Sequence, residues 1–101
     1  MKILLVDDDK TCLAELERAF QEAGFETSRA CDGAEALEAA RRDPPDLVIS
    51  EVLLPSLDGF SLLRAWLQDP VLRGVPFTFF TGTFIGEADR SMARTLGAYR
   101  S

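Results

Sequence analysis

Histidine is absent from this sequence, and only two cysteines, Cys12 and Cys31, are present. The two thiols have no CxxC spacing and no imidazole with which to share a metal ion, so the pattern disfavours a zinc site. We therefore predict that both cysteines are reduced and serve in packing, rather than forming a disulfide.

Positive charge is also scarce. The chain carries 17 acidic and 11 basic residues, for a formal net charge of −6. This balance argues against binding to nucleic acid or to an anionic membrane through net charge. Arg41 and Arg42 are the only adjacent bases, and a solvated helix face explains such a pair. We expect neither nucleic acid nor a membrane to be a direct partner.

Long hydrophobic runs, linkers, repeats and low-complexity stretches are missing as well, although 47% of the residues are hydrophobic. No run is long enough to span a bilayer. The N-terminus leads from Met1 and Lys2 directly into strand-like residues, which does not suit a signal peptide. The sequence is therefore expected to form a single soluble domain over residues 1–101, located in the cytoplasm.

The sequence alternates between short apolar runs typical of strands and apolar residues at the spacing typical of helices. Four short runs suit strands, at residues 3–6, 25–30, 47–50 and 77–80. Apolar residues at helical spacing follow each run and predict four helices, the third over residues 58–68. Their apolar residues are Leu13, Leu16 and Phe20; Ala36, Leu37 and Ala40; Phe60, Leu63 and Leu67 on one side with Leu62 and Trp66 adjoining; and Ile85, Ala88, Met92 and Leu96.

Capping and breaking residues stand at the expected helix ends. Gly24 suits a helix C-terminus, and Asp32 followed by Glu35 resembles a capping box. Pro44 follows the second helix and forbids its continuation. The phenylalanines 77, 79 and 80 are expected to be core residues on a strand that is buried from both sides.

The strict order of strand and helix predicts an α/β fold with a doubly wound parallel sheet, because parallel strands need crossover connections. In such sheets, ligands bind beyond the carboxyl ends of the strands. That rule selects the acidic run Asp7–Asp9 after the first strand and Glu51 at the end of the third. It also selects Thr81 with Gly82 at the end of the fourth.

Three motifs, ILLVDDD, DLVISEVLLPSLDG and VPFTFFTG, resemble in order and spacing the receiver domains of two-component response regulators. The resemblance covers the whole chain. It implies a flavodoxin-like sheet of strand order 2-1-3-4-5 and a signalling domain rather than an enzyme. It also implies a histidine kinase or phosphotransfer protein upstream, and an output domain or effector protein downstream.

The resemblance implies roles for individual residues. Asp7 and Asp8 match the acids that bind Mg²⁺, and Leu53 matches the position whose backbone carbonyl completes the metal site. Thr81 matches the hydroxyl that contacts the phosphoryl group in the active domain. The phosphoacceptor, an aspartate in the family and also close to the metal, is Glu51 here.

A second departure concerns the family's lysine at the end of strand five, which would fall beyond Ser101. We therefore expect a receiver domain that is truncated before strand five. The uncovered edge of strand four, or helix four, is then a possible site of self-association.

Glutamate retains a carboxylate that can attack phosphorus, but its extra methylene moves the oxygen by about 1.5 Å. A misplacement of about 1 Å can cost on the order of 100-fold in an in-line transfer. We expect phosphoryl acceptance at Glu51 to be slow or undetectable. A weakly bound Mg²⁺, or another divalent cation, is expected to offset the repulsion among the acids.

Three alternatives stay open. The run Asp7–Asp9 also suits an N-cap with first-turn acids, and Asp58 suits the N-cap of the third helix better than a substitute acceptor. A pseudo-receiver, which binds partner proteins without phosphorylation, would also carry an altered acceptor. A small phosphate- or nucleotide-binding α/β domain would use the turn at Thr81, although no GxGxxG or P-loop supports it.

Overall fold

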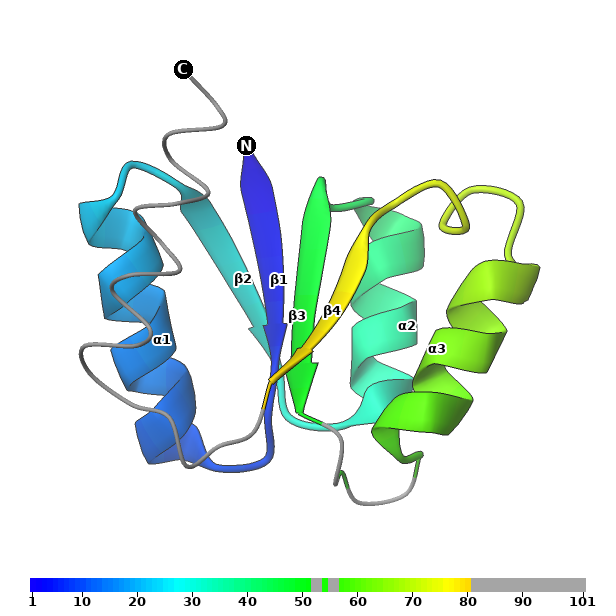
Figure 1. Cartoon of the computed structure of the whole chain (residues 1–101), viewed down its shortest axis with the longest axis horizontal. Coiled ribbons are helices and arrows are strands. Elements are labelled where there is room, and N and C mark those ends of the chain that lie inside the picture. The colour runs from blue at the N-terminus through cyan, green and yellow to red at the C-terminus, as the bar shows by residue number, and fades with distance from the viewer. Residues whose placement is uncertain (52–53, 55–56, 81–101) are drawn as a thin grey trace.

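The structure is a computed structural model that describes residues 1–51, 54 and 57–80, and strands and helices alternate strictly along them (Figure 1). The elements are β1 (Lys2–Val6), α1 (Lys10–Glu22), β2 (Glu26–Ala30), α2 (Gly33–Arg42), β3 (Leu47–Glu51), α3 (Gly59–Gln68) and β4 (Phe77–Phe80). The four predicted strands and the first three predicted helices are confirmed. The predicted fourth helix, over Ile85 to Leu96, lies outside the described residues.

All strand pairs of the sheet are parallel, in the order β2-β1-β3-β4. This confirms the predicted α/β architecture and strand order of a flavodoxin-like domain. The register places Val6 beside Ser50, and Glu51 beside Phe80. Because the strands run the same way, their carboxyl ends meet at one edge of the sheet (Figure 1).

The helices form two layers, with α1 on one face of the sheet and α2 and α3 on the other (Figure 1). Phe20 of α1 packs with Leu5 and Ile49 on the first face, and both cysteines belong to this side as free thiols. Trp66 of α3 packs with Val6 and other apolar residues on the second face. No helix in the described part of the chain is long and apolar enough to cross a membrane.

An aspartate precedes each of the three helices that the structure describes and caps it. Asp9, Asp32 and Asp58 accept hydrogen bonds from backbone N–H groups of the following first turn, at 2.8 to 3.2 Å. These bonds satisfy donors that have no partner within the helix. Gly24 follows α1 with φ of 94°, a conformation that glycine adopts without strain. The predicted roles of Asp32, Asp58 and Gly24 are confirmed.

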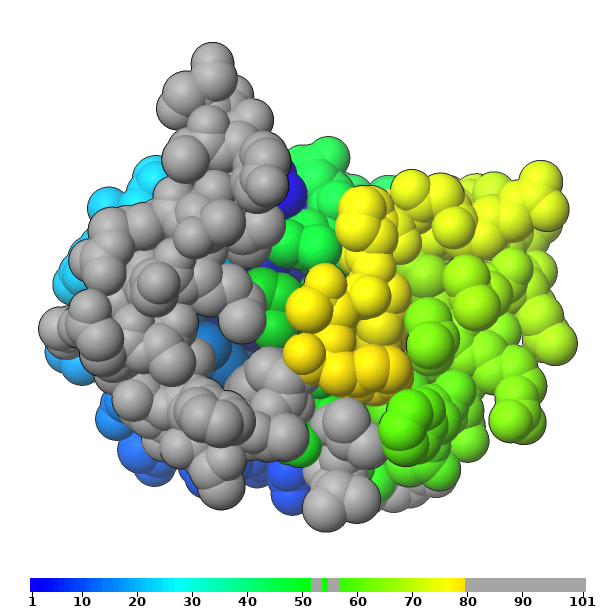
Figure 2. All heavy atoms as spheres, in the orientation of Figure 1, coloured from blue at the N-terminus to red at the C-terminus, as the bar shows by residue number. Residues whose placement is uncertain are grey.

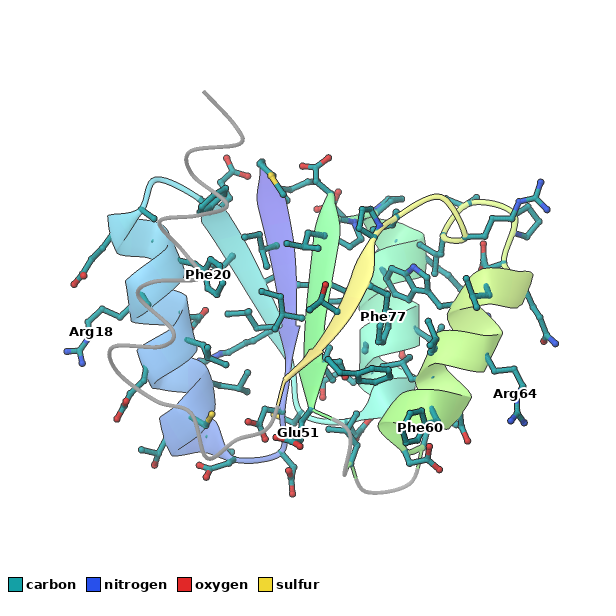
Figure 3. All side chains as sticks on the ribbon, viewed as in Figure 1. Arg18, Phe20, Glu51, Phe60, Arg64 and Phe77 are labelled. Carbon is teal, nitrogen blue, oxygen red and sulfur yellow. The ribbon has the colours of Figure 1, made fainter. Side chains whose placement is uncertain are left out.

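The packing of α3 differs from the arrangement that its pattern suggested. The side carrying Phe60 and Leu67 is exposed, at 60% and 55%, whereas the adjoining Leu62 and Trp66 are fully buried. Figure 3 shows Phe60 at the lower, N-terminal end of α3, near the carboxyl edge of the sheet. Two neighbouring apolar stripes lie on this helix. The one with Leu62 and Trp66 is buried against the sheet, whereas the other meets it at the Phe60 ring, which contacts Phe79 of β4.

The expectation that β4 is buried from both sides is wrong. Phe77 and Phe79 are half-buried and Thr78 is exposed, while the Phe80 side chain lies outside the described atoms. Alternate residues of a strand point to opposite faces. Phe77 and Phe79 therefore pack toward α3. Thr78 points to the opposite face of the sheet, on which α1 packs mainly against β1 and β2. Figure 2 shows the yellow atoms of β4 at the surface.

Candidate functional site

The predicted acids gather where β1 and β3 end. Asp7 follows β1 directly and is only 2% exposed, whereas Asp8 is exposed to solvent. Glu51 is the last residue of β3 and is half-buried, at the lower end of the strand in Figure 3. The charge of Glu51 acts on the Asp7 carboxylate, so the structure brings these two acids into one electrostatic site.

Backbone hydrogen bonds fix Asp7 in place. Its N–H donates to the carbonyl of Ala30 at 3.1 Å, and its Oδ1 accepts the N–H of Asp9 at 3.0 Å. The other carboxylate oxygen, Oδ2, is buried and has no hydrogen-bond partner among the described atoms. A buried carboxylate oxygen without a donor is costly unless a cation or a proton compensates it.

The electrostatic environment of Asp7 also disfavours the charged form of its carboxyl group. Burial raises the pKa of this carboxyl, and the negative charge of Glu51 raises the pKa further. The Asp9 N–H and the Cys12 thiol act in the opposite direction through hydrogen bonds. The net effect is a raised pKa, because the carboxylate has lost water and gained an acidic neighbour.

Two other acids near this edge serve local structure. Asp9 caps α1 through the N–H groups of Thr11 and Cys12, which confirms the capping alternative for this one member of the acidic run. Asp58 caps α3, and the Ser61 N–H lowers the pKa of its carboxyl. Both carboxylates already accept helix N–H groups.

The residues fit a hard divalent cation in one respect. A buried carboxylate oxygen without a donor, beside a second acid, offers the oxygen ligands that Mg²⁺ prefers. Among the described residues, however, no group of three or more acidic, cysteine or histidine side chains is placed to hold a metal ion. Two further predicted members of the site, Leu53 and Thr81, lie outside the described residues, as does the Thr81 turn of the nucleotide-binding alternative.

Sequence reasoning missed two residues beside this edge. Ser50 is fully buried and its hydroxyl donates to the carbonyl of Glu51 at 3.0 Å. A serine directly after the apolar run Leu47–Ile49, within the same predicted strand, was the available signal. Gly33 is buried at the start of α2, and nothing in the local sequence indicates what it contacts.

Comparison with known proteins identifies the class to which this parallel sheet and its acidic edge belong. The Response regulator receiver domain family matches residues 3–100. The chain therefore belongs to the response regulator receiver domain family, the receiving module of two-component signal transduction.

Individual relatives agree with this assignment. The response regulator PleD of Caulobacter vibrioides is 36% identical over 97 residues, which cover 96% of this chain and 21% of PleD. The alkaline phosphatase synthesis transcriptional regulatory protein PhoP of Bacillus subtilis is 33% identical, over 96% of this chain and 39% of PhoP. The chain thus spans well under half the length of these curated relatives.

A solved structure shows the same fold. The signal receiver domain of a signal transduction histidine kinase from Syntrophus aciditrophicus is 34% identical, with a TM-score of 0.77. The match covers 94% of this chain and 70% of that one. Receiver domains of different parent proteins thus share this architecture, so the fold does not identify the output.

Proposed function

We propose that this chain is a receiver domain whose acceptance of a phosphoryl group is impaired, because Glu51 occupies the phosphoacceptor position. The observation that carries the proposal is that Glu51 ends β3 at the carboxyl edge, where the register of β1 and β3 also brings the buried, partly unsatisfied carboxylate of Asp7. Asp7, Asp8, Glu51 and the backbone carbonyl of Leu53 would hold a weakly bound Mg²⁺ or other divalent cation. The cation would neutralise charge during phosphoryl transfer.

The chemistry of the chain's own residues limits the transfer. The Glu51 carboxylate can act as a nucleophile, and its strand position is fixed by pairing with β4 and by the Ser50 hydroxyl on its carbonyl. The side chain is one methylene longer than aspartate, which displaces the attacking oxygen by about 1.5 Å. Thr81 would contact the transferred group. Loss of alignment of this size lowers the rate by on the order of 100-fold.

A histidine kinase or phosphotransfer protein would supply the phosphoryl group in the cytoplasm, and an output domain or effector protein would read the result. The second candidate is a pseudo-receiver that binds partner proteins without phosphorylation. The glutamate at the acceptor position, half-buried at the end of β3, is compatible with this candidate as well. Under either candidate, the edge of β4 or helix four would be the surface for self-association.

The test is the intact mass of the protein after incubation with Mg²⁺ and acetyl phosphate, beside the variant Glu51→Asp. We expect the variant to gain one phosphoryl group and the parent to gain none, or to gain it about 100-fold more slowly. If neither protein gains mass, the pseudo-receiver replaces the proposal. Equal labelling of both proteins would show that the length of the side chain does not matter.

A further inference from the structure

A hollow of about 260 Å³ lies beside the start of α1 and the end of β2. Its lining residues are Lys10 and Leu13 of α1, Arg29 of β2, and Cys31, which follows that strand. A single water molecule takes about 30 Å³ in the liquid, and small-molecule sites start at about 300 Å³. The hollow therefore has room for a small ligand.

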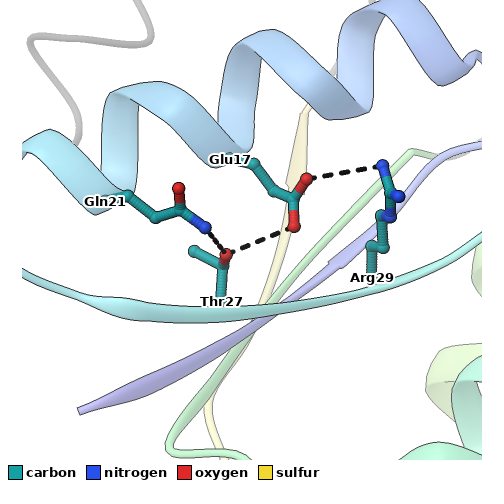
Figure 4. Close-up of polar contacts among 4 residues, drawn as sticks. All are labelled: Glu17, Gln21, Thr27 and Arg29. Atoms are coloured by element: carbon teal, nitrogen blue, oxygen red, sulfur yellow. Dashed lines mark hydrogen bonds and ion pairs between the residues drawn. The ribbon is translucent and has the colours of Figure 1, made fainter.

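The regular spacing of both elements brings these side chains together. Lys10 and Leu13 are three residues apart on α1, so they lie on one face of the helix. Arg29 and Cys31 are two residues apart along extended chain, so they lie on one face of the sheet. Figure 4 shows the Arg29 side chain reaching from β2 toward α1. The hollow thus lies between a helix and a strand that the core holds together.

The lining combines an apolar surface with two cations. Leu13 is 1% exposed and belongs to the apolar cluster on this face of the sheet, against which Cys31 also packs. Lys10 and Arg29 are exposed to solvent. Among the residues that the structure describes, no carboxylate lies within ion-pair distance of Lys10, although the chain as a whole is acidic. The hollow therefore offers positive charge beside an apolar wall.

Two acids near the hollow do not cancel this charge. Glu17 accepts from Nη1 of Arg29 at 3.5 Å, which uses one of the five N–H donors of the guanidinium. Asp9 caps α1, and its Oδ1 accepts two N–H groups of the helix. The rest of the guanidinium and the Lys10 ammonium can therefore still receive an oxyanion.

We propose that this hollow is a binding site for a small organic anion, a carboxylate or phosphate with an apolar body. Arg29 holds the oxyanion with its planar fork, Lys10 adds a second positive charge, and Leu13 contacts the apolar body. Cys31 forms the wall beside the bound molecule. The proposal goes beyond the proposed function and is independent of it, because none of these residues belongs to the acidic site.

The test uses benzoate, which joins a carboxylate to an apolar ring, and benzamide, its neutral counterpart. Two-dimensional NMR follows the backbone amide signals of the protein while each compound is added at low ionic strength. We expect saturable shifts at Leu13 and Cys31 with benzoate. Benzamide should bind about fivefold more weakly or less tightly still, because one unit charge at about 4 Å in water is worth about fivefold in affinity.

Neutral variants of the two bases identify the site. Lys10→Gln and Arg29→Gln should each weaken benzoate binding about fivefold. Arg18→Gln is the matched control, because Arg18 is an exposed base elsewhere on α1 and points away from the sheet in Figure 3. The control should stay within about twofold of the parent. Thermal unfolding of each variant checks that the fold is kept.

A variant of Glu17 should act in the opposite direction. Glu17→Gln releases Arg29 from its ion pair, so benzoate should bind severalfold more tightly. Glu22→Gln, an exposed substitution on the same helix, removes one negative charge without touching Arg29 and is the matched control. Equal gains in the two variants would overturn the proposal, because net charge alone would explain them.

The Cys31 thiol provides a second measurement. Dithiodipyridine, a neutral disulfide, forms a mixed disulfide with an accessible thiol and releases one thiopyridine, and peptide mapping by mass assigns the label. We expect benzoate to slow the labelling of Cys31 severalfold in the parent but not in Arg29→Gln. Benzamide at the same concentration should leave the labelling rate unchanged.

Three results would overturn the proposal. The first is the absence of saturable shifts at Leu13 and Cys31. The second is equal binding of benzoate and benzamide, which is the result of an apolar crevice without charge selection. The third is an equal loss of binding in Arg29→Gln and Arg18→Gln, which would place the anion outside the hollow.

Discussion

The backbone N–H of Asp9 donates to Oδ1 of Asp7 over 3.0 Å, and Oδ2 of the same carboxylate is left buried without a partner among the described atoms. Asp7→Asn removes a buried charge that Glu51 repels. We expect this variant to be more stable than the parent in metal-free buffer, by about 1–3 kcal/mol. Urea unfolding followed by circular dichroism measures the difference. Asp8→Asn, at an exposed position, should change stability by less than about 0.5 kcal/mol; a destabilised Asp7→Asn would refute the prediction.

Magnesium should stabilise the parent through the same carboxylate. A ligand that binds only the folded state adds about 1.4 kcal/mol when its concentration is ten times the Kd. We expect the melting temperature to rise with MgCl₂, to return on addition of EDTA, and not to respond in Asp7→Asn. NaCl at equal ionic strength controls for screening. A response of equal size in Asp7→Asn would place the cation elsewhere.

Trp66 is fully buried, and its Nε1 donates to the carbonyl of Val75 at 3.3 Å. Its ring also meets Phe77, with centroids 5.6 Å apart. Trp66→Ala should lower the free energy of unfolding by about 3–5 kcal/mol. Leu67→Ala, at the next residue but 55% exposed, is the matched control, with an expected change within about 0.5 kcal/mol. Equal losses in the two variants would contradict the burial of α3 described above.

The contrast between Trp66 and Leu67 also shows where sequence reasoning stops. Alternating periods predict the order of strands and helices, and the parallel sheet brings Asp7 and Glu51 to one edge. Periodicity cannot choose between two adjacent apolar stripes on one helix, because both satisfy the helical repeat. That choice depends on which stripe meets the sheet.

The close approach of Gly33 to Leu57, where an added Cβ atom would lie 2.5 Å from the Leu57 backbone oxygen, could not be predicted for a similar reason. The two residues lie on segments far apart in the sequence, and glycine leaves no side-chain pattern to interpret. The capping roles of Asp32 and Asp58 were predictable, because an N-cap depends only on the few residues that follow it.

Acidic pH should reduce the difference in stability between the parent and a variant at Asp69, the residue that follows α3. Asp69 accepts the Val71 N–H at 2.8 Å and the Arg41 Nε at 3.0 Å, and these bonds lower the pKa of its carboxyl, that from Val71 most strongly. A pKa that is lower in the folded state gives stability above the unfolded value of about 4, and this stability is lost as the pH falls through the folded value. Asp69→Asn should therefore melt below the parent at pH 7, and the gap should narrow below about pH 4.

Thermal unfolding between pH 3 and pH 7 measures this gap. Glu22→Gln, an exposed substitution on α1, removes one negative charge without touching the Asp69 bonds and controls for net charge. A difference in melting temperature that stays constant from pH 3 to pH 7 would show that the negative charge of the Asp69 carboxylate does not contribute to stability.

Edge strand β2 is joined to α1 by polar contacts that should be weak and sensitive to salt. Glu17 pairs with Arg29 at 3.5 Å, and the Thr27 hydroxyl accepts from Gln21 at 2.8 Å while donating to Glu17 at 3.4 Å (Figure 4). Exposed ion pairs contribute about 0.2–1 kcal/mol. A double-mutant cycle with Glu17→Gln and Arg29→Gln should give a coupling energy in that range, which should vanish in 1 M NaCl, where the screening length is about 3 Å. A coupling that survives 1 M salt would mean that the hydrogen bond from Arg29 to Glu17, rather than the attraction between their charges, joins the helix to the strand.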